Sequence, residues 1–220
     1  MAIKIPVSYP DIGKEEEKLV IKAIRSGWIS SHGPYVKEFE RRFAEYLGVK
    51  HAIAVSSGTS ALHLALLAVG VGPGDEVIIP DLTFASPANM VLLTGAKPIF
   101  ADVTQEYWCI DPREIRKIIS SRNKVKAIIV VHLYGHPADM DEILEIAQDN
   151  NIYVIEDAAE AHGAEYKGRK VGGIGDVGCF SFYANKIITT GEGGMVVTND
   201  DDIAERVRRL RDQGYNVSLR

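Results

Sequence analysis

The sequence predicts an α/β fold with a mainly parallel central sheet flanked by helices. From residue 51 onward, short apolar runs alternate with segments of helical periodicity. Runs such as 126–132 are continuous in Ile, Val and Ala, which is typical of parallel strands covered on both faces. No internal repeat, low-complexity tract or linker interrupts the chain. We therefore expect one domain, with residues 1–50 as its N-terminal arm and first helices and residues 51–220 as its main body.

The first 50 residues predict two helices behind an N-terminal arm. Apolar residues recur at helical spacing over 14–26, and Gly27 ends that run. Pro34 begins a second run of the same kind, and Gly48 closes it.

The rest of the chain predicts alternating strands and helices. Apolar, β-branched runs indicate the strands, and apolar residues at helical spacing indicate the helices. Strands are expected at 51–55, 76–80, 98–103, 126–132, 152–157, 179–183 and 194–199. Helices are expected at 58–70, 85–94, 112–120, 139–149 and 201–212, with Asp139 and the acidic run 200–202 as caps of the last two.

The composition disfavours several classes of function. The 220-residue chain is 46% hydrophobic and carries a net charge of -5, whereas a nucleic-acid binder normally shows a basic face. Its longest apolar runs are too short to cross a bilayer, and its N-terminus lacks the apolar core of a signal peptide. Cys109 and Cys179 make neither a disulfide framework nor a four-ligand zinc site. We expect a cytoplasmic protein without nucleic-acid, membrane or metal partners.

The segment SSGTS (56–60) runs from a predicted strand directly into a predicted helix. A helix N-terminus offers backbone N–H groups and a partial positive charge to an anion. Gly58 lets the backbone approach a ligand closely, and Thr59 and Ser60 add hydroxyl donors. A capped helix after a tight turn explains the same residues equally well. The segment matches neither the Walker nor the dinucleotide GxGxxG pattern, so ATP and NAD are not supported.

Glu156 and Asp157 end a very apolar predicted strand. A carboxylate is costly to bury there unless a cation or hydrogen-bond donors meet it. Three explanations are open at this point: a structural arginine, a cap on the next helix, or the protonated ring nitrogen of a heterocyclic ligand.

Lys186 lies just after a predicted strand, and Ile187, Ile188 and the Gly-rich turn 191–194 follow it. A lone lysine is usually a solvated surface residue. A lysine confined among apolar residues is, however, what covalent amine chemistry needs. Ser181 and Tyr183, two strand positions apart, are expected to point to the same side.

Taken in order, these motifs resemble one family. They are SSGTSAL from residue 56, DLTF from 81, EDAAEAHG from 156, SFYANK from 181 and GEGG from 191. The set resembles the DegT/DnrJ/StrS family of nucleotide-sugar aminotransferases, which depend on pyridoxal 5'-phosphate (PLP), and the resemblance runs from Pro6 to Asn216. It implies the large domain of a fold type I PLP-dependent transferase.

The resemblance implies a role for each residue around the cofactor ring. Lys186 would be the catalytic residue, binding PLP through its amino group and moving protons at the reacting carbon. Asp157 would pair with the ring nitrogen, and Glu160 would lie near the ring hydroxyl. Phe84 would stack on the ring face.

It also implies how the phosphate is held. Gly58, Thr59 and Ser181 would bind it within one subunit. Asn216, in a Gly-Tyr-Asn motif, would reach the phosphate of the neighbouring subunit, so a homodimer with shared active sites is expected.

The implied reaction moves an amino group from L-glutamate to a nucleotide-linked keto-deoxysugar, giving a 4-amino-4,6-dideoxysugar. The family continues past GYNVSLR into a smaller C-terminal domain, so the resemblance implies a chain truncated before that domain. A noncatalytic PLP-binding paralogue or fragment is the alternative.

Overall fold

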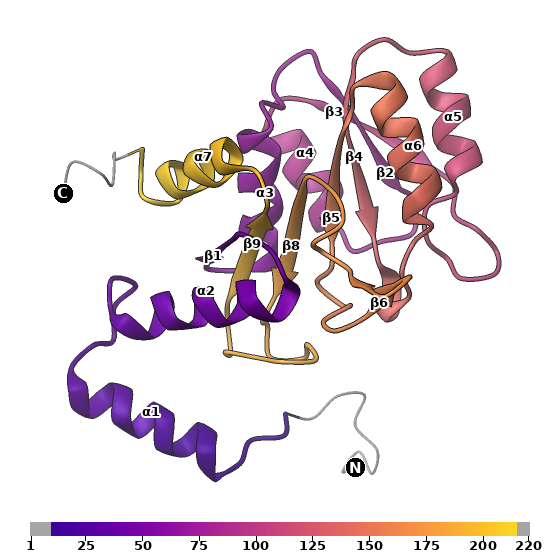
Figure 1. Ribbon diagram of the computed structural model, residues 1–220. Helices are drawn as coiled ribbons and strands as arrows, with labels where there is room; N and C mark the ends of the chain where they lie inside the picture. Colours follow the sequence, from indigo (N-terminus) through magenta and orange to yellow (C-terminus); the bar gives the residue numbers. More distant parts are fainter. Residues whose placement is uncertain (1–9, 215–220) are drawn as a thin grey trace, which may run out of the picture.

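A computed structural model describes residues 10–214, which form one seven-stranded sheet flanked by helices. Its strand order is β1-β9-β8-β5-β4-β2-β3 (Figure 1). The strands are β1 (His51–Val55), β2 (Glu76–Pro80), β3 (Lys97–Ala101), β4 (Val125–Val131), β5 (Tyr153–Asp157), β8 (Val177–Ser181) and β9 (Gly194–Thr198). Only β9 among them runs antiparallel to its neighbours, β1 and β8. The predicted mainly parallel sheet is therefore confirmed.

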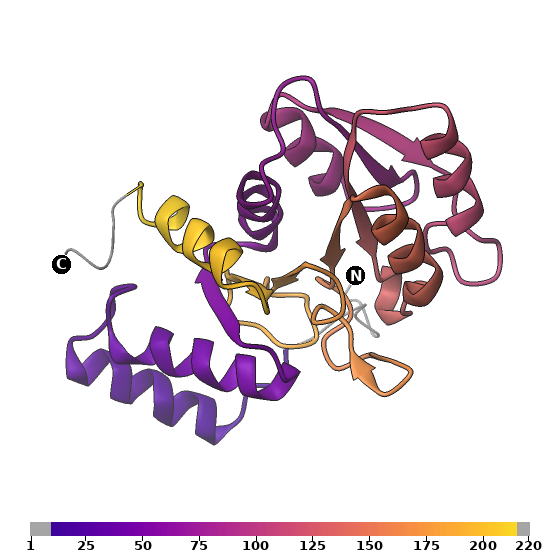
Figure 2. The same cartoon turned by 45° about the horizontal axis from the view of Figure 1, so that its top comes forward.

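Helices cover both faces of this sheet. Figures 1 and 2 show α5 and α6 on one face and α3 and α4 on the other. In β4 the five consecutive residues 127–131 are all buried, as continuous apolar runs predict for a doubly covered strand. The helices are α1 (Lys14–Ser26), α2 (Pro34–Leu47), α3 (Gly58–Ala68), α4 (Ser86–Leu93), α5 (Pro112–Ser120), α6 (Met140–Asn150) and α7 (Asp201–Arg211).

Aromatic packing attaches α2 to the sheet. The Phe43 ring meets Phe180 and Phe182 at centroid distances of 5.0 and 5.4 Å, both edge-on. Phe180 in β8 and Phe182 directly after it point to the face opposite to Cys179 and Ser181, because side chains alternate along an extended chain. Helix α1, by contrast, has no buried residue and lies beyond α2 (Figures 1 and 2).

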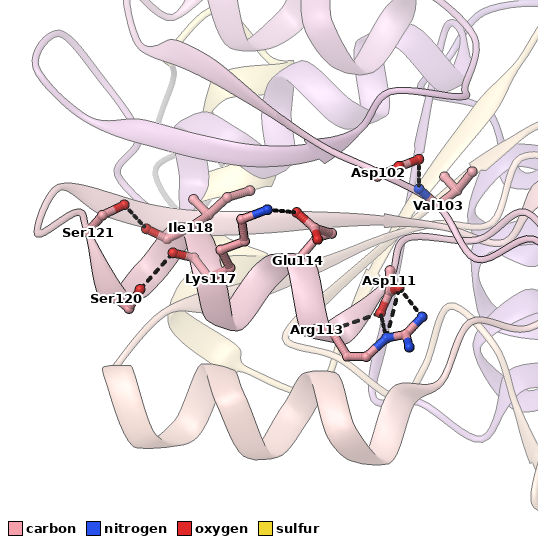
Figure 3. A network of polar contacts seen from close by, with 9 residues as sticks. All are labelled: Asp102, Val103, Asp111, Arg113, Glu114, Lys117, Ile118, Ser120 and Ser121. Carbon is pink, nitrogen blue, oxygen red and sulfur yellow. Dashed lines mark hydrogen bonds and ion pairs between the residues drawn. The ribbon is translucent and has the colours of Figure 1, made fainter.

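Helix ends are fixed by capping. The Asp111 carboxylate begins α5 by accepting the backbone N–H of Arg113 at 2.9 Å, and it also binds the Arg113 guanidinium (Figure 3). Asp200 caps α7 in the predicted way, accepting the N–H of Ile203. Asp139 occupies the predicted N-cap position of α6, but its side chain does not cap the helix. Its carboxylate accepts the hydroxyl of Tyr166 at 2.7 Å and makes no hydrogen bond to the start of α6.

Three local features differ from the sequence prediction. Strand β8 begins and ends two residues earlier than expected, because Val177 already pairs with β5. Strand β3 ends at Ala101, two residues early, and the chain then folds back on itself. A hairpin of β6 (Glu165–Tyr166) and β7 (Arg169–Lys170) was not predicted, since two-residue strands show no periodicity.

Within residues 10–214, no helix combines the length and the apolar character needed to cross a membrane.

We predict that Phe43→Ala lowers the free energy of unfolding by about 3–5 kcal/mol, because it removes a buried ring and leaves a cavity. Chemical denaturation measures this change. The matched control is Leu19→Ala on α1, whose side chain is exposed and whose loss should change stability by less than about 0.5 kcal/mol. Equal effects of the two substitutions would contradict the packing of α2 on the sheet.

Candidate functional site

A cavity of about 310 Å³ opens at the carboxyl end of the parallel strands, where ligands of such sheets bind. Segments that follow β1, β2, β4, β5 and β8 line it. All the predicted site residues within the described range line this one cavity, namely Gly58, Thr59, Phe84, Asp157, Glu160, Ser181 and Lys186. Asn216 lies outside the described residues, so its role stays a prediction.

The start of α3 forms one wall of the cavity. Ser57 caps the helix by accepting the N–H of Ser60 at 3.0 Å, and the Thr59 hydroxyl bonds to that of Ser86 at 2.8 Å. A Cβ atom on Gly58 would lie 2.7 Å from the Cβ of Ser181, a distance that real Cβ atoms do not show. Gly58 is therefore needed for the helix start to pass against β8, and the capped turn leaves room for the anion site that the sequence suggests.

Asp157 is buried at the cavity wall. Its Oδ1 accepts the N–H of Ala159 at 3.1 Å, and within residues 10–214 no cationic side chain forms an ion pair with it. Burial raises the pKa of this carboxyl group to about 6, although the hydrogen bond from Ala159 and the charge of Lys186 oppose the rise. The sequence left three explanations open for a buried carboxylate at this position. Among the described residues, Asp157 neither pairs with an arginine nor caps a helix, so two of them do not apply to it.

Glu156 points to the other face of β5 and is satisfied there. It is fully buried and accepts four hydrogen bonds of 2.6–2.9 Å, which hold its pKa below the usual range although burial alone would raise it. Because His132 Nδ1 accepts the N–H of Ala138, the ring proton sits on Nε2 and is donated to Glu156. The donors are His132 Nε2 and the backbone N–H groups of Gly172, Ile174 and Gly175.

Lys186 reaches into the cavity toward Glu160. Its Nζ lies 3.5 Å from Glu160 Oε1, and only 20% of its side chain is exposed. The other carboxylate oxygen, Oε2, accepts the backbone N–H of Tyr134 at 3.0 Å. Glu160 is thus held between a backbone donor and the lysine, so the Lys186 amine has a defined direction within the cavity.

His162 lies behind the part of the cavity formed by Glu160 and Lys186. Its ring packs against Phe180 and Phe182 at centroid distances of 5.4 and 5.5 Å. Burial lowers its pKa to about 4, so the ring is neutral near pH 7. In the structure it is part of the aromatic packing under α2.

Several residues of the cavity were missed by sequence reasoning. They include Thr83, Ser86, Leu133, Asn185 and Glu192. The hydroxyl of Thr83 is buried and has no hydrogen-bond partner among the described residues. Its position directly before Phe84, in the DLTF motif, was the available signal. No group of three or more His, Cys, Asp or Glu side chains that could hold a metal occurs within the described range.

The family comparison agrees with this geometry. The model of the DegT/DnrJ/EryC1/StrS aminotransferase family matches residues 10–219. The chain belongs to this family. A GDP-perosamine synthase of Caulobacter vibrioides is 51% identical over 217 residues, which are 99% of this chain and 58% of that protein.

Solved structures of similar proteins share the fold of this chain. An aminotransferase from Psychrobacter cryohalolentis is 41% identical, with a TM-score of 0.90 over 96% of this chain and 53% of its own. A Streptococcus pneumoniae protein solved in its PLP form is 32% identical, with a TM-score of 0.88 over 94% of this chain and 57% of its own. The fold type I architecture is confirmed. The chain spans less than two thirds of the length of each.

We predict that Gly58→Ala destabilises the fold by about 1–3 kcal/mol, because the new methyl group overlaps Ser181. Adding Ser181→Gly removes the overlapping Cβ and should recover most of the loss. Gly72→Ala is the control, since a Cβ there meets open space. Thermal denaturation of the unmodified chain, both single variants, the double variant and Gly72→Ala tests this, and additive effects in the double variant would contradict it.

A second prediction concerns pH. Asp157 has a folded-state pKa of about 6 against an ordinary value of 3.8. Between these values the folded state holds a proton that the unfolded state has lost, so this group makes stability fall as pH rises from about 4 to about 6. His162, with its lowered pKa, works in the opposite sense over a similar window, which masks the trend in the unmodified protein.

The comparison with Asp157→Asn cancels the contribution of His162. We expect this variant to be about 2 kcal/mol more stable than the unmodified chain at pH 8 and equally stable near pH 4. Urea unfolding at the two pH values measures the difference. A constant difference at both would show that Asp157 ionises normally.

Proposed function

We propose that this chain is the cofactor-binding part of a PLP-dependent aminotransferase. The reaction moves the amino group of L-glutamate to the ketone of a nucleotide-linked keto-deoxysugar, leaving 2-oxoglutarate and a 4-amino-4,6-dideoxysugar. One observation carries the proposal: Lys186 shares a cavity with Asp157, a buried carboxylate without a cationic partner among the described residues. The similarity to a GDP-perosamine synthase supports the sugar substrate.

The residues of the cavity fit PLP. A protonated ring nitrogen would supply the cation that Asp157 lacks. The buried Thr83 hydroxyl has a hydrogen bond to give, and the start of α3 suits a phosphate because its N–H groups have no carbonyl partner within the helix. The Phe84 ring is 76% exposed beside the cavity and has a free face for stacking.

When bound, PLP supplies an electron-withdrawing ring that stabilises negative charge on the carbon that loses its proton. Asp157 would keep a proton at the ring nitrogen, which would preserve that electron demand. Lys186 Nζ would hold the cofactor and would move the proton at the reacting carbon. Glu160, held by the N–H of Tyr134, directs the lysine and would lie near the ring hydroxyl.

The proposal also covers the oligomeric state of the protein. We propose a homodimer in which Asn216 of one subunit reaches the phosphate site of the other. The relatives have further chain beyond the matched part, and we assign part of the sugar pocket to it.

The two cysteines are buried and unpaired, which supports a reducing cytoplasmic setting.

The test is the visible absorption spectrum of the chain mixed with PLP. We expect a band shifted from that of free PLP, and we expect Lys186→Arg to lose it almost completely, since arginine keeps the charge but cannot form the bond. Lys97→Arg is the matched control, because Lys97 is exposed on the edge strand β3 and its replacement should leave the band unchanged.

Glutamate then separates turnover from binding. The proposed amino transfer predicts that the band collapses when glutamate is added and that 2-oxoglutarate appears in equal amount. A band that survives glutamate would mean that the chain binds PLP without amino transfer. A band that survives in Lys186→Arg would show that another group holds the cofactor.

A further inference from the structure

The side chains of two exposed aromatic residues near the cavity have no part in the mechanism above. Trp108 follows β3 and is 52% exposed, and Tyr134 follows β4 and is 76% exposed. Strands β3, β2 and β4 are parallel neighbours, so the segments that leave their carboxyl ends meet at one edge of the sheet. Phe84, which follows β2, lies at the same edge. An aromatic side chain is thus presented after each of three adjacent strands.

The backbone is strained at both residues. Trp108 has a φ of 60° and Tyr134 a φ of 51°, in the left-handed region that bulky side chains rarely adopt. Such strain costs about 1 kcal/mol or more per residue, and it typically persists where a binding or catalytic group must be aimed. Here it places two rings edge-on, with centroids 6.4 Å apart and planes at 74°.

The two segments are fastened to each other. Cys109 Sγ donates to the carbonyl of His136 at 3.3 Å, and the Tyr107 ring stacks on the His136 ring at 4.9 Å. With the Trp108–Tyr134 contact, three consecutive residues of one segment touch the other. The rings are therefore carried on a rigid support rather than on a fraying loop.

The loop that carries Trp108 is also closed at its base. The N–H of Asp111 donates to the carbonyl of Asp102 at 3.0 Å, and Thr104 pairs with the carbonyl of Cys109 at 2.9 Å. The Asp102 side chain accepts the N–H of Val103, as Figure 3 shows beside Asp111. This loop is a pinned hairpin with Trp108 near its tip.

The aromatic pair is joined to the reaction cavity. Tyr134 donates its backbone N–H to Glu160, which lines the cavity, and the preceding residue Leu133 lines it as well. The rings themselves lie outside that lining. The two rings are therefore placed to contact a part of the substrate that is attached to the reacting sugar but lies some distance from it.

We propose that Trp108 and Tyr134 form a stacking site for the base of the nucleotide that carries the sugar. This inference rests on the proposed function and assigns its recognition of the nucleotide. The remote end of a nucleotide-linked sugar is a flat aromatic base, and stacking on aromatic side chains is the interaction that every base can make. The phosphates then bridge the distance from this rim to the sugar in the cavity.

The test is calorimetric binding of GDP to the PLP-free chain, with inorganic pyrophosphate as the probe that lacks a base. We expect GDP to bind and pyrophosphate to bind at least tenfold more weakly. Trp108→Asn and Tyr134→Asn should each raise the Kd for GDP by about tenfold, the usual scale for losing one base–aromatic stack. Asparagine tolerates the left-handed backbone, so both variants remove the ring without adding strain.

The matched control is Phe100→Thr. Phe100 is 58% exposed on β3, ahead of its carboxyl end, and its removal should leave the Kd for GDP unchanged. Equal affinities in the unmodified chain and the two asparagine variants would overturn the proposal, as would a chain that binds no GDP. A dimer that dissociates in Trp108→Asn while its GDP affinity stays the same would instead assign the rings to a contact between copies.

Binding of GDP needs neither PLP nor glutamate, so the two hypotheses can fail separately. Ring-dependent GDP binding by a chain that shows no PLP band would sink the proposed reaction and leave the stacking site. A glutamate-sensitive PLP band in a chain whose GDP affinity ignores both rings would do the reverse.

Discussion

The cavity depends on the carboxylate of Glu156, which is buried completely and yet ionised. Four donors converge on it, from His132 at the end of β4 and from the loop 172–175. Removing one partner of such a network leaves the others unsatisfied in a medium of low polarity, which costs far more than one hydrogen bond. The network fixes the end of β5, and Asp157 follows on the opposite face. It also anchors His132, from which the turn carrying Tyr134 begins.

The two adjacent carboxylates of β5 have opposite roles. Glu156 is satisfied by the protein and stabilises the fold, whereas Asp157 receives one backbone N–H and carries the cost of its burial. A protein that retains an unpaired buried carboxylate gives up stability that a ligand can restore. Together with the Thr83 hydroxyl, which has no partner among the described residues, this agrees with the proposed binding of a cationic ligand that also accepts a hydrogen bond.

Most of the strands and helices, and the residues that gather at the cavity, could be predicted from the sequence. The strands are apolar enough to recognise, and their motifs meet because parallel strands end at one edge. The direction of β9 could not be predicted, since an apolar run reads the same both ways. The left-handed turns at Trp108 and Tyr134 could not be predicted, because tertiary contacts hold them. These are the contact between the two rings and the hydrogen bond from Tyr134 to Glu160. The partners of Glu156 were hidden because three of them are backbone groups some 16–19 residues away.

Helix α1 has a different kind of stability from the rest of the chain. None of its 13 residues is buried, and Leu19, Val20 and Ile24 face solvent. A helix of this length is marginal in water when only its own hydrogen bonds and end charges support it. Its amide protons should therefore exchange with solvent through local melting, independently of global unfolding. A molecule that packs against its apolar residues would therefore stabilise this helix. Slower amide exchange in α1 would then reveal such a contact even where exchange in the sheet stays the same.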